Sequence, residues 1–248
     1  GGVVRIAVST PPELGDSGQG GSALRQLVLP QLFVAYPDGT WRASLVEPDS
    51  DRAAKDGRSA SFKLRDGARW NNGTPITIED VRRSVDPRFV AGVDGPAKDG
   101  RIQLRFKQKL PNWRQLWSMS QFVEPSSPNL FGGPFKVTSV VSGFETVVVR
   151  NSDWYGSDSD ANTPGGPFLD EIHLLLVSDP VIARQMLAAG QVDVLSPVAD
   201  TVRTQQLRSI RDVTVSTAPV DRSGWTTSLL LNDQLPLEMR RRIVRDFL

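Results

Sequence analysis

The sequence predicts an α/β protein built on a mixed sheet, with a β-rich insertion. Segments with strand patterns and segments with helical patterns follow one another along the chain instead of forming separate blocks. Several strand-like segments are separated by only a few turn residues, which is typical of antiparallel hairpins. The chain has 248 residues, 39% of them hydrophobic, so it can bury a sizeable core without metal or disulfide support.

The first predicted elements are a strand, a glycine-rich loop and a helix. Residues 3–8 form a short apolar run that is typical of a strand. Residues 15–21 are rich in glycine and predict a loop. Ser22 is a suitable N-cap for a helix over residues 23–29, where apolar residues recur at helical spacing.

Residues 56–85 carry the strongest local pattern. Within them, residues 59–65 alternate small or apolar side chains with polar ones, as a half-buried strand does. The Asp-Gly pair at 66–67 predicts a turn, after which residues 68–70 can return as a second strand.

A helix is predicted after these strands. Thr77 stands three residues before Asp80, which is the spacing of a capping box. Glu79 and Asp80 could be mistaken for an acid–base pair, but capping and the helix dipole explain two acidic residues in a first turn better. The helix should end near residue 86, because Pro87 follows.

The rest of the chain continues to mix strands and helices. Asp179 is a predicted N-cap, with Pro180 at the first helical position and Gly190 at the helix end. Loops are expected at 92–100 and 152–167. The remaining predicted elements are strands at 101–106, 171–177, 192–195, 213–215 and 227–231, a hairpin of 135–141 with 146–150, and helices at 112–119, 179–190, 201–208 and 236–248.

Composition excludes several classes of protein. Lys and Arg number 29 and Asp and Glu 28, for a net charge of +1, so the whole-chain charge gives no reason to bind nucleic acid or anionic lipid. The absence of cysteine excludes disulfides, thiolate catalysis and cysteine-based metal sites. His173 is the only histidine, which excludes sites with several histidines. No apolar run approaches the roughly 18–20 residues of a membrane span.

Five segments carry motifs that occur together in one known family. The most distinctive has Phe-Lys-Leu-Arg at 62–65, Gly-Thr-Pro at 73–75 and Glu-Asp-Val at 79–81. The others are Gly-Pro-Phe at 133–135 with residues 147–155, Asp-Glu-Ile at 170–172 with residues 189–194, residues 229–242, and the opening strand with residues 36–47. In this order and spacing they resemble family 5 of the extracellular solute-binding proteins, which serve ABC importers of peptides, nickel and some sugars.

The resemblance implies a periplasmic-binding-protein-like fold of class II, with the first lobe only and the second lobe absent. It divides the chain into a first part of the lobe I core at 1–45, a β-rich insertion subdomain at 46–165, and a return to the core at 166–248. Members of the family continue beyond the segment around Arg241, so an isolated first lobe or a natural truncation is expected. The chain departs from the family pattern at Phe135, where an aromatic hydroxyl is usual, and at Gly132-Gly133.

The function implied by the resemblance is solute binding without catalysis. The default ligand is a peptide, held in an interlobe cleft of which this chain supplies one side. The expected partner is an ABC permease in the membrane, and the protein is expected to be a monomer without cofactor or bound metal. Its expected location is extracytoplasmic, with a lipid anchor. The alternative is a related lipoprotein that acts as a sensor or scaffold in envelope biogenesis without transport.

The predicted ligand-binding loop runs from Thr10 to Ser22. Loops at the carboxyl ends of strands bind ligands in open α/β sheets, and glycines let backbone amides approach a ligand. A mobile surface loop is the alternative for this segment. Trp225 precedes the predicted strand at 227–231. Its ring could stack on a ligand, although it could equally be a core or rim residue. The predicted ligand-binding residues are Thr10, Pro11, Glu13, Ser17, Gly20, Gly21 and Trp225.

Other conspicuous residues are better explained without a ligand. His173 lies in a strand among apolar residues, and no Gly-x-Ser-x-Gly motif accompanies it, so a structural histidine is favoured over a hydrolase. The acidic pairs at 49–51 and 158–160 lack the full spacing of a calcium loop. Trp113 and Trp117 are predicted to lie in the core of the insertion.

Overall fold

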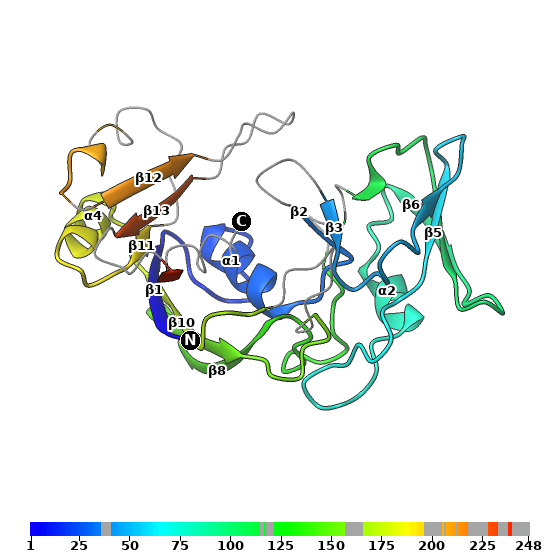
Figure 1. The fold of residues 1–248 in the computed structure, drawn as a ribbon, viewed down its shortest axis with the longest axis horizontal. Coiled ribbons are helices and arrows are strands. Elements are labelled where there is room, and N and C mark those ends of the chain that lie inside the picture. The colour runs from blue at the N-terminus through cyan, green and yellow to red at the C-terminus, as the bar shows by residue number, and fades with distance from the viewer. Residues whose placement is uncertain are drawn as a thin grey trace.

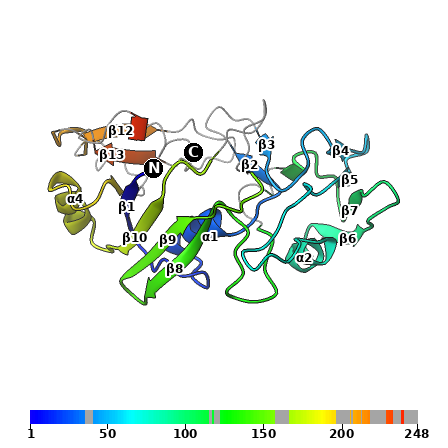
Figure 2. The same cartoon turned by 60° about the horizontal axis from the view of Figure 1, so that its bottom comes forward.

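The fold is built on two main sheets, which lie towards opposite ends of the long axis of the molecule (Figure 1). It is given by a computed structural model. The structure describes residues 1–35, 41–114, 117, 122–156, 166–195, 205, 207–211, 213–217, 228–232 and 238–239. Figure 2 shows the larger sheet with β1 and β10 at one end of the molecule and β4 to β7 at the other.

The larger sheet has seven strands and is mixed. In sheet order they are β12 (Val213–Thr217), β13 (Ser228–Asn232), β11 (Val194–Leu195), β1 (Val3–Val8), β10 (Glu171–Leu176), β9 (Glu145–Arg150) and β8 (Phe135–Val141). β1 pairs in parallel with both β10 and β11, and the other neighbours pair antiparallel. The predicted mixed sheet is therefore confirmed.

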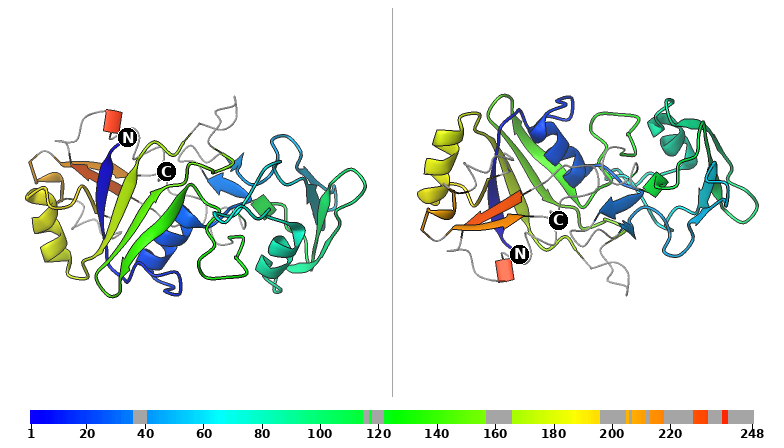
Figure 3. Two further views of the ribbon diagram at one scale, coloured as in Figure 1. Left: turned by 90° about the horizontal axis from the view of Figure 1, so that it is seen from below. Right: turned by 90° about the horizontal axis from the view of Figure 1, so that it is seen from above.

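Two helices cover opposite faces of this sheet (Figure 3). Alternate residues of a strand point to opposite faces. Ile6 of β1 packs in the cluster with Leu24 and Leu27 of α1 (Gln19–Val28), whereas the next residue, Ala7, packs in the cluster with Leu187 of α4 (Pro180–Ala188). The centre of the sheet is therefore buried on both sides, which suits the mainly apolar sequences at the carboxyl ends of β1 and β10.

The predicted N-cap of α4 is confirmed, and that of α1 is not. Asp179 caps α4 as predicted, because its carboxylate accepts the N–H groups of Val181 at 2.7 Å and Ile182 at 3.2 Å. The prediction that Ser22 caps α1 is wrong. The N-cap is Gly18, and Ser22 lies inside the helix, where its N–H donates to the Gly18 carbonyl at 2.9 Å.

The smaller main sheet is antiparallel throughout. Its order is β4 (Arg52–Ala53), β5 (Ser59–Phe62), β7 (Ile102–Phe106) and β6 (Val90–Asp94), and a separate pair joins β2 (Phe33–Ala35) to β3 (Trp41–Ala43). The second strand predicted at 68–70 is only an isolated bridge between Arg69 and Pro75. β6 overlaps the loop expected at 92–100, because its pairing with β7 compensates for weak local strand signals.

Helix α2 (Ile78–Ser84) packs against the smaller sheet and starts as predicted. The capping box links Thr77 and Asp80 in both directions: the Thr77 N–H donates to the Asp80 carboxylate at 2.7 Å, and the Asp80 N–H donates to the Thr77 carbonyl at 3.1 Å. The carboxylates of Glu79 and Asp80 also pair with Arg82 and Arg83. These two acids are therefore structural.

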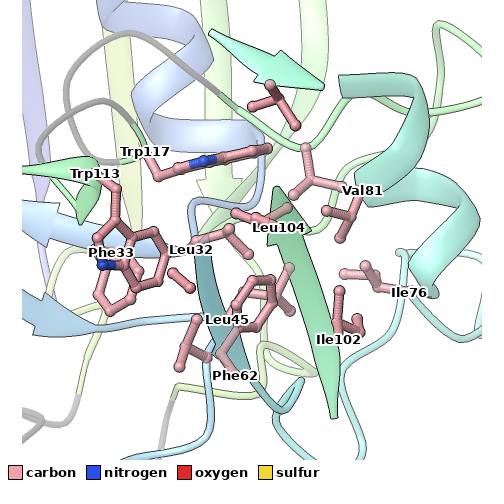
Figure 4. Close-up of a cluster of buried hydrophobic side chains, with 14 of the residues drawn as sticks. Leu32, Phe33, Leu45, Phe62, Ile76, Val81, Ile102, Leu104, Trp113 and Trp117 are labelled. Carbon is pink, nitrogen blue, oxygen red and sulfur yellow. The ribbon is translucent and has the colours of Figure 1, made fainter. Parts of the chain in front are cut away.

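An aromatic core holds the smaller sheet together (Figure 4). Trp113 and Trp117 are fully buried, which confirms their predicted place in a core. Trp113 meets Phe33 edge to face at 5.1 Å between ring centroids and stacks on Phe62 at 6.1 Å. Within the predicted helix at 112–119, residues 113, 114 and 117 are helical and the others from 115 to 119 lie outside the described residues.

The domain limits at 46 and 165 remain a prediction. The smaller sheet uses residues 52–106, but the β8–β9 hairpin, which falls within the same limits, belongs to the larger sheet. Most of the helix expected at 236–248 lies outside the described residues, although Glu238 and Met239 are helical. Among the described residues, none of the helices has the length and apolar character that crossing a bilayer requires.

Candidate functional site

The candidate site is the loop at the carboxyl end of β1, residues 9–18, called here the β1–α1 loop. The parallel strands β1, β10 and β11 all end at this edge of the sheet. The Val177 N–H, just after β10, donates to the Val8 carbonyl at 2.8 Å, so the two strand ends are adjacent. This edge is where open α/β sheets bind ligands.

A network centred on Asp16 holds the loop in one conformation. The Asp16 carboxylate accepts the Thr10 hydroxyl at 2.7 Å and the Gly18 N–H at 3.0 Å. The Thr10 oxygen in turn accepts the Gly20 N–H at 2.9 Å. The hydrogen bond from Thr10, helped by backbone N–H groups and the charge of Arg25, outweighs desolvation and lowers the pKa of Asp16.

The loop is also attached to the last turn of α1. The Arg25 guanidinium donates to the carbonyls of Leu14 at 2.8 Å and Asp16 at 2.6 Å. At the other end of the loop, the Ser9 N–H and hydroxyl both donate to the Gln19 side-chain oxygen, at 3.0 and 2.7 Å. These bonds connect both ends of the loop to α1.

Gly20 and Gly21 allow the loop backbone to lie directly on α1. A Cβ atom at Gly20 would lie 2.1 Å from the Thr10 carbonyl oxygen, and one at Gly21 would lie 2.0 Å from that of Asp16. Both contacts are far too short, so only glycine fits. Packing alone thus accounts for glycine at these two positions, and their assignment to ligand contact stays a prediction.

The turn of the β8–β9 hairpin forms the neighbouring wall of the site. Glu13 Oε1 accepts the Ser142 hydroxyl at 2.7 Å and the Gly143 N–H at 3.4 Å. The buried hydroxyl of Thr146 donates to the Pro12 carbonyl at 2.7 Å. The loop and the hairpin turn are therefore joined directly by hydrogen bonds. Local sequence patterns missed this contact, because its residues are far apart in the chain.

The predicted ligand-binding residues differ in exposure. Ser17 is exposed, whereas Thr10, Pro11 and Glu13 are half-buried. Gly20 and Gly21 are buried, as described above. Trp225 lies outside the described residues. The exposed and half-buried members thus come together on one loop.

Exposed apolar side chains occur at the same edge of the sheet. Phe144 is 58% exposed, and its carbonyl accepts the Leu176 N–H at 2.8 Å at the end of β10. Val181 and Ile182, in the first turn of α4, are about half exposed. Polar turn groups beside apolar side chains are the combination that binding sites for small molecules and peptides use.

His173 of β10 lies between the carboxylates of Glu145 in β9 and Glu171 in β10. Its Nδ1 is 2.6 Å from Glu145 Oε1, and its Nε2 is 2.5 Å from Glu171 Oε1. Burial acts to lower the pKa of His173, but the hydrogen bonds and charges of the two glutamates outweigh it and raise the pKa. Because both ring nitrogens are occupied by carboxylates, the ring has no free nitrogen with which to activate a hydroxyl nucleophile.

In the described part of the chain, no group of three or more His, Asp or Glu side chains is arranged to hold a metal ion. Of the acidic pairs considered for calcium, Asp51 forms an ion pair with Arg114. The pair at 158–160 lies outside the described residues.

The chain matches no family model, but it is similar to curated binding proteins. It is 23% identical to the oligopeptide-binding protein OppA of Mycobacterium tuberculosis over an alignment 264 residues long. The alignment includes 90% of this chain and 43% of OppA. It is 25% identical to the probable D,D-dipeptide-binding periplasmic protein DdpA of Escherichia coli over an alignment 250 residues long. The alignment includes 86% of this chain and 46% of DdpA. The chain therefore spans less than half the length of either relative.

Solved structures of solute-binding proteins share the fold. AgaA of A. tumefaciens R10, in complex with agropinic acid, has a TM-score of 0.72 at 20% identity, covering 87% of this chain and 48% of AgaA. AppA of Bacillus subtilis, in complex with a nonapeptide, has a TM-score of 0.69 at 15% identity, covering 87% of this chain and 47% of AppA. The predicted resemblance and the periplasmic-binding-protein-like fold of a single lobe are confirmed by these comparisons.

Proposed function

We propose that this chain supplies one side of the binding site of an extracytoplasmic solute-binding component of an ABC importer. The observation that carries the proposal is the match of nearly the whole chain to about half of proteins named for binding peptides and other small solutes. The function is binding without catalysis. The default ligand is a peptide, because the curated relatives are named for oligopeptides and dipeptides.

The β1–α1 loop is the part of the proposed site that this chain contributes. Ligand would approach Ser17 and the half-buried Thr10, Pro11 and Glu13 at the carboxyl edge of the sheet. The ordered hydrogen bonds of the loop support this role, because a preorganised surface loses less entropy on binding. Gly20, Gly21 and Trp225 complete the proposed set, the two glycines by letting the loop rest on α1.

The second side of the site would come from another lobe, as the length of the relatives suggests. Ligand held between two lobes stabilises the closed form of a hinged protein, and an ABC permease would recognise that form. The protein would act as a monomer outside the cytoplasm, held at the membrane by a lipid anchor. In the alternative role in envelope biogenesis, a scaffold would require none of this ligand dependence, and a sensor would need ligand binding but no permease.

Ligand-dependent stability tests the proposal. Thermal unfolding of the complete gene product and of the 248-residue chain is followed with and without a panel of short peptides. A peptide at 100 times its Kd should stabilise the complete protein by about 2.7 kcal/mol, and should stabilise the 248-residue chain much less. Equal stabilisation of both would contradict a site shared between two lobes, and no stabilisation by any peptide would favour the scaffold role.

A further inference from the structure

The far end of the smaller sheet carries a cluster of four basic side chains. Lys55 and Arg58 belong to the turn between β4 and β5, and Lys107 and Lys109 follow β7. These four residues are called the basic tip. Backbone bonds join the two segments, from the Leu110 N–H to the Gly57 carbonyl and from the Phe106 N–H to the Arg58 carbonyl, both at 2.8 Å. Figure 2 shows β4, β5 and β7 side by side at this end of the molecule.

The four cations of the basic tip are exposed and unpaired. Within the described ranges, none of their side chains has an ion-pair or hydrogen-bond partner. Other arginines of the same sheet and of α2 are neutralised by nearby carboxylates, in the pairs Arg82–Glu79, Arg83–Asp80, Arg88–Asp86, Arg101–Asp99 and Arg105–Asp94. The cations of the basic tip differ from these arginines in having no carboxylate partner in the part of the chain that the structure describes.

Acidic residues near the basic tip do not cancel its charge. Asp56 lies in the same turn, where its carboxylate accepts the Arg58 N–H at 2.9 Å. The Asp86 carboxylate interacts electrostatically with Lys107, but it already forms an ion pair with Arg88. Because screening limits electrostatic attraction to about 8–10 Å at moderate salt, this local excess acts on a nearby surface even though the whole chain carries only +1.

The chemistry of the basic tip indicates what it binds. Three of its four cations are lysines, which act as hydrated point charges on flexible stems and suit many phosphates at variable positions. Among the described residues, the large exposed apolar side chains lie elsewhere, so the tip lacks the aromatic rings on which single-stranded nucleic acids stack. We propose that the basic tip is a docking surface for anionic membrane lipids, whose headgroup phosphates it contacts.

This proposal changes the conclusion drawn from net charge alone. The whole-chain charge gives no reason to bind anionic lipid, but folding brings four basic residues from two separate segments to one end of one sheet. The β1–α1 loop lies at the edge of the larger sheet, so docking through the basic tip on the smaller sheet would leave that loop uncovered. The lipid contact needs neither the solute nor a permease, and its failure would leave the proposed solute binding unaffected.

Vesicle co-sedimentation of the 248-residue chain tests the proposal. The chain should bind vesicles that contain phosphatidylglycerol, should not bind pure phosphatidylcholine vesicles, and should dissociate as salt is raised. Each basic residue at an anionic surface is worth about fivefold in affinity, so K107E/K109E should weaken binding by at least about 25-fold. No binding to the anionic vesicles, or equal binding to the neutral ones, would overturn the proposal.

A matched control separates the basic tip from net charge. Lys98, in the turn at the opposite end of β7, and Lys136 in β8 have no side-chain partner in the described structure. K98E/K136E changes the net charge as much as K107E/K109E and should retain binding. An equal loss in both variants would overturn the proposal. Circular dichroism checks the fold, and K55E/R58E replaces K107E/K109E if that variant does not fold.

Discussion

Glu13 and Ser142 lie 129 positions apart in the chain and are joined by a hydrogen bond of 2.7 Å. This bond connects the β1–α1 loop to the turn of the β8–β9 hairpin. The buried bond from Thr146 to Pro12 reinforces the same junction. The proposed binding surface therefore depends on two segments that become neighbours only when the larger sheet is complete.

Removing the Ser142 hydroxyl should loosen the loop. Ser142→Ala should cost about 0.5–1 kcal/mol, at the low end for a hydrogen bond because the site is exposed. Hydrogen exchange of the amides at residues 9–18 should speed up, while exchange in β1 and β10 stays unchanged. Ser139→Ala, on the exposed part of β8, is the control and should have no effect on the loop.

Gly20 should not tolerate alanine. Alanine is intrinsically better than glycine in a helix by about 1 kcal/mol, but the added Cβ would meet the Thr10 carbonyl at 2.1 Å. The clash should win, and Gly20→Ala should lower the free energy of unfolding by about 1–3 kcal/mol in urea titrations. Gly15→Ala has open space around its Cβ and should change stability little. A Gly20→Ala variant as stable as the unmodified protein would contradict the described packing.

Ser17 is the exposed predicted ligand-binding residue of the loop, which makes it the best position to block the site. Ser17→Trp should weaken peptide binding to the complete gene product by tenfold or more, because a bulky ring would occupy space proposed for the ligand. Its thermal stability without ligand should be unchanged, since Ser17 is exposed. Ser139→Trp serves as the matched substitution on β8. Unaltered peptide affinity in Ser17→Trp would remove the loop from the proposed site.

The lone histidine should titrate above its usual range. The pKa of His173 is raised by Glu145 and Glu171, so protonated His173 stabilises the folded state. This stabilisation should be fully present below the unfolded-state pKa of about 6.5 and be lost as pH rises through the higher folded-state pKa. A proton NMR titration gives the pKa directly, because the chain has one histidine.

The same interaction can be checked through stability. In urea titrations, the unmodified protein should lose stability over that pH window relative to His173→Gln. Parallel pH profiles for the two proteins, or an NMR pKa at or below 6.5, would show that the glutamates do not hold the imidazolium.

Trp113 should tolerate loss of its indole nitrogen better than loss of its rings. Its Nε1 is buried, and no hydrogen-bond partner is found for it in the described structure. Trp113→Phe keeps an aromatic ring against Phe33 and Phe62 and breaks no hydrogen bond, so it should cost less than Trp113→Ala, for which about 3–5 kcal/mol is expected. Guanidinium titrations of both variants measure the difference. Equal costs would indicate that the aromatic contacts contribute little.

Local signals predicted the elements that local chemistry controls. The capping box at Thr77 and the Asp179–Pro180 helix start were predicted, because each lies within a few residues of the helix that it begins. The start of α1 was misjudged, because glycine is a poor helix former and only packing against the Thr10 carbonyl explains Gly20 inside a helix.

Long-range pairing decided what the sequence could not predict. β6 contains Gly92, which weakens a strand, yet it forms because β7 supplies an antiparallel partner, with one irregularity between Val90 and Gly92. The β8–β9 hairpin was predicted, but the sheet to which it belongs was not. It joins the larger sheet through the pairing of β9 with β10, which no local pattern reveals. The contact of Glu13 with the hairpin turn follows from that pairing.

The central position of β1 has a consequence for biosynthesis. This strand is synthesised before its neighbours β10 and β11, which end at Leu176 and Leu195. The nascent chain must therefore keep β1 without its sheet partners until β10 and β11 have been translated. The smaller sheet closes by Phe106, so it can form on the ribosome while β1 still awaits its partners.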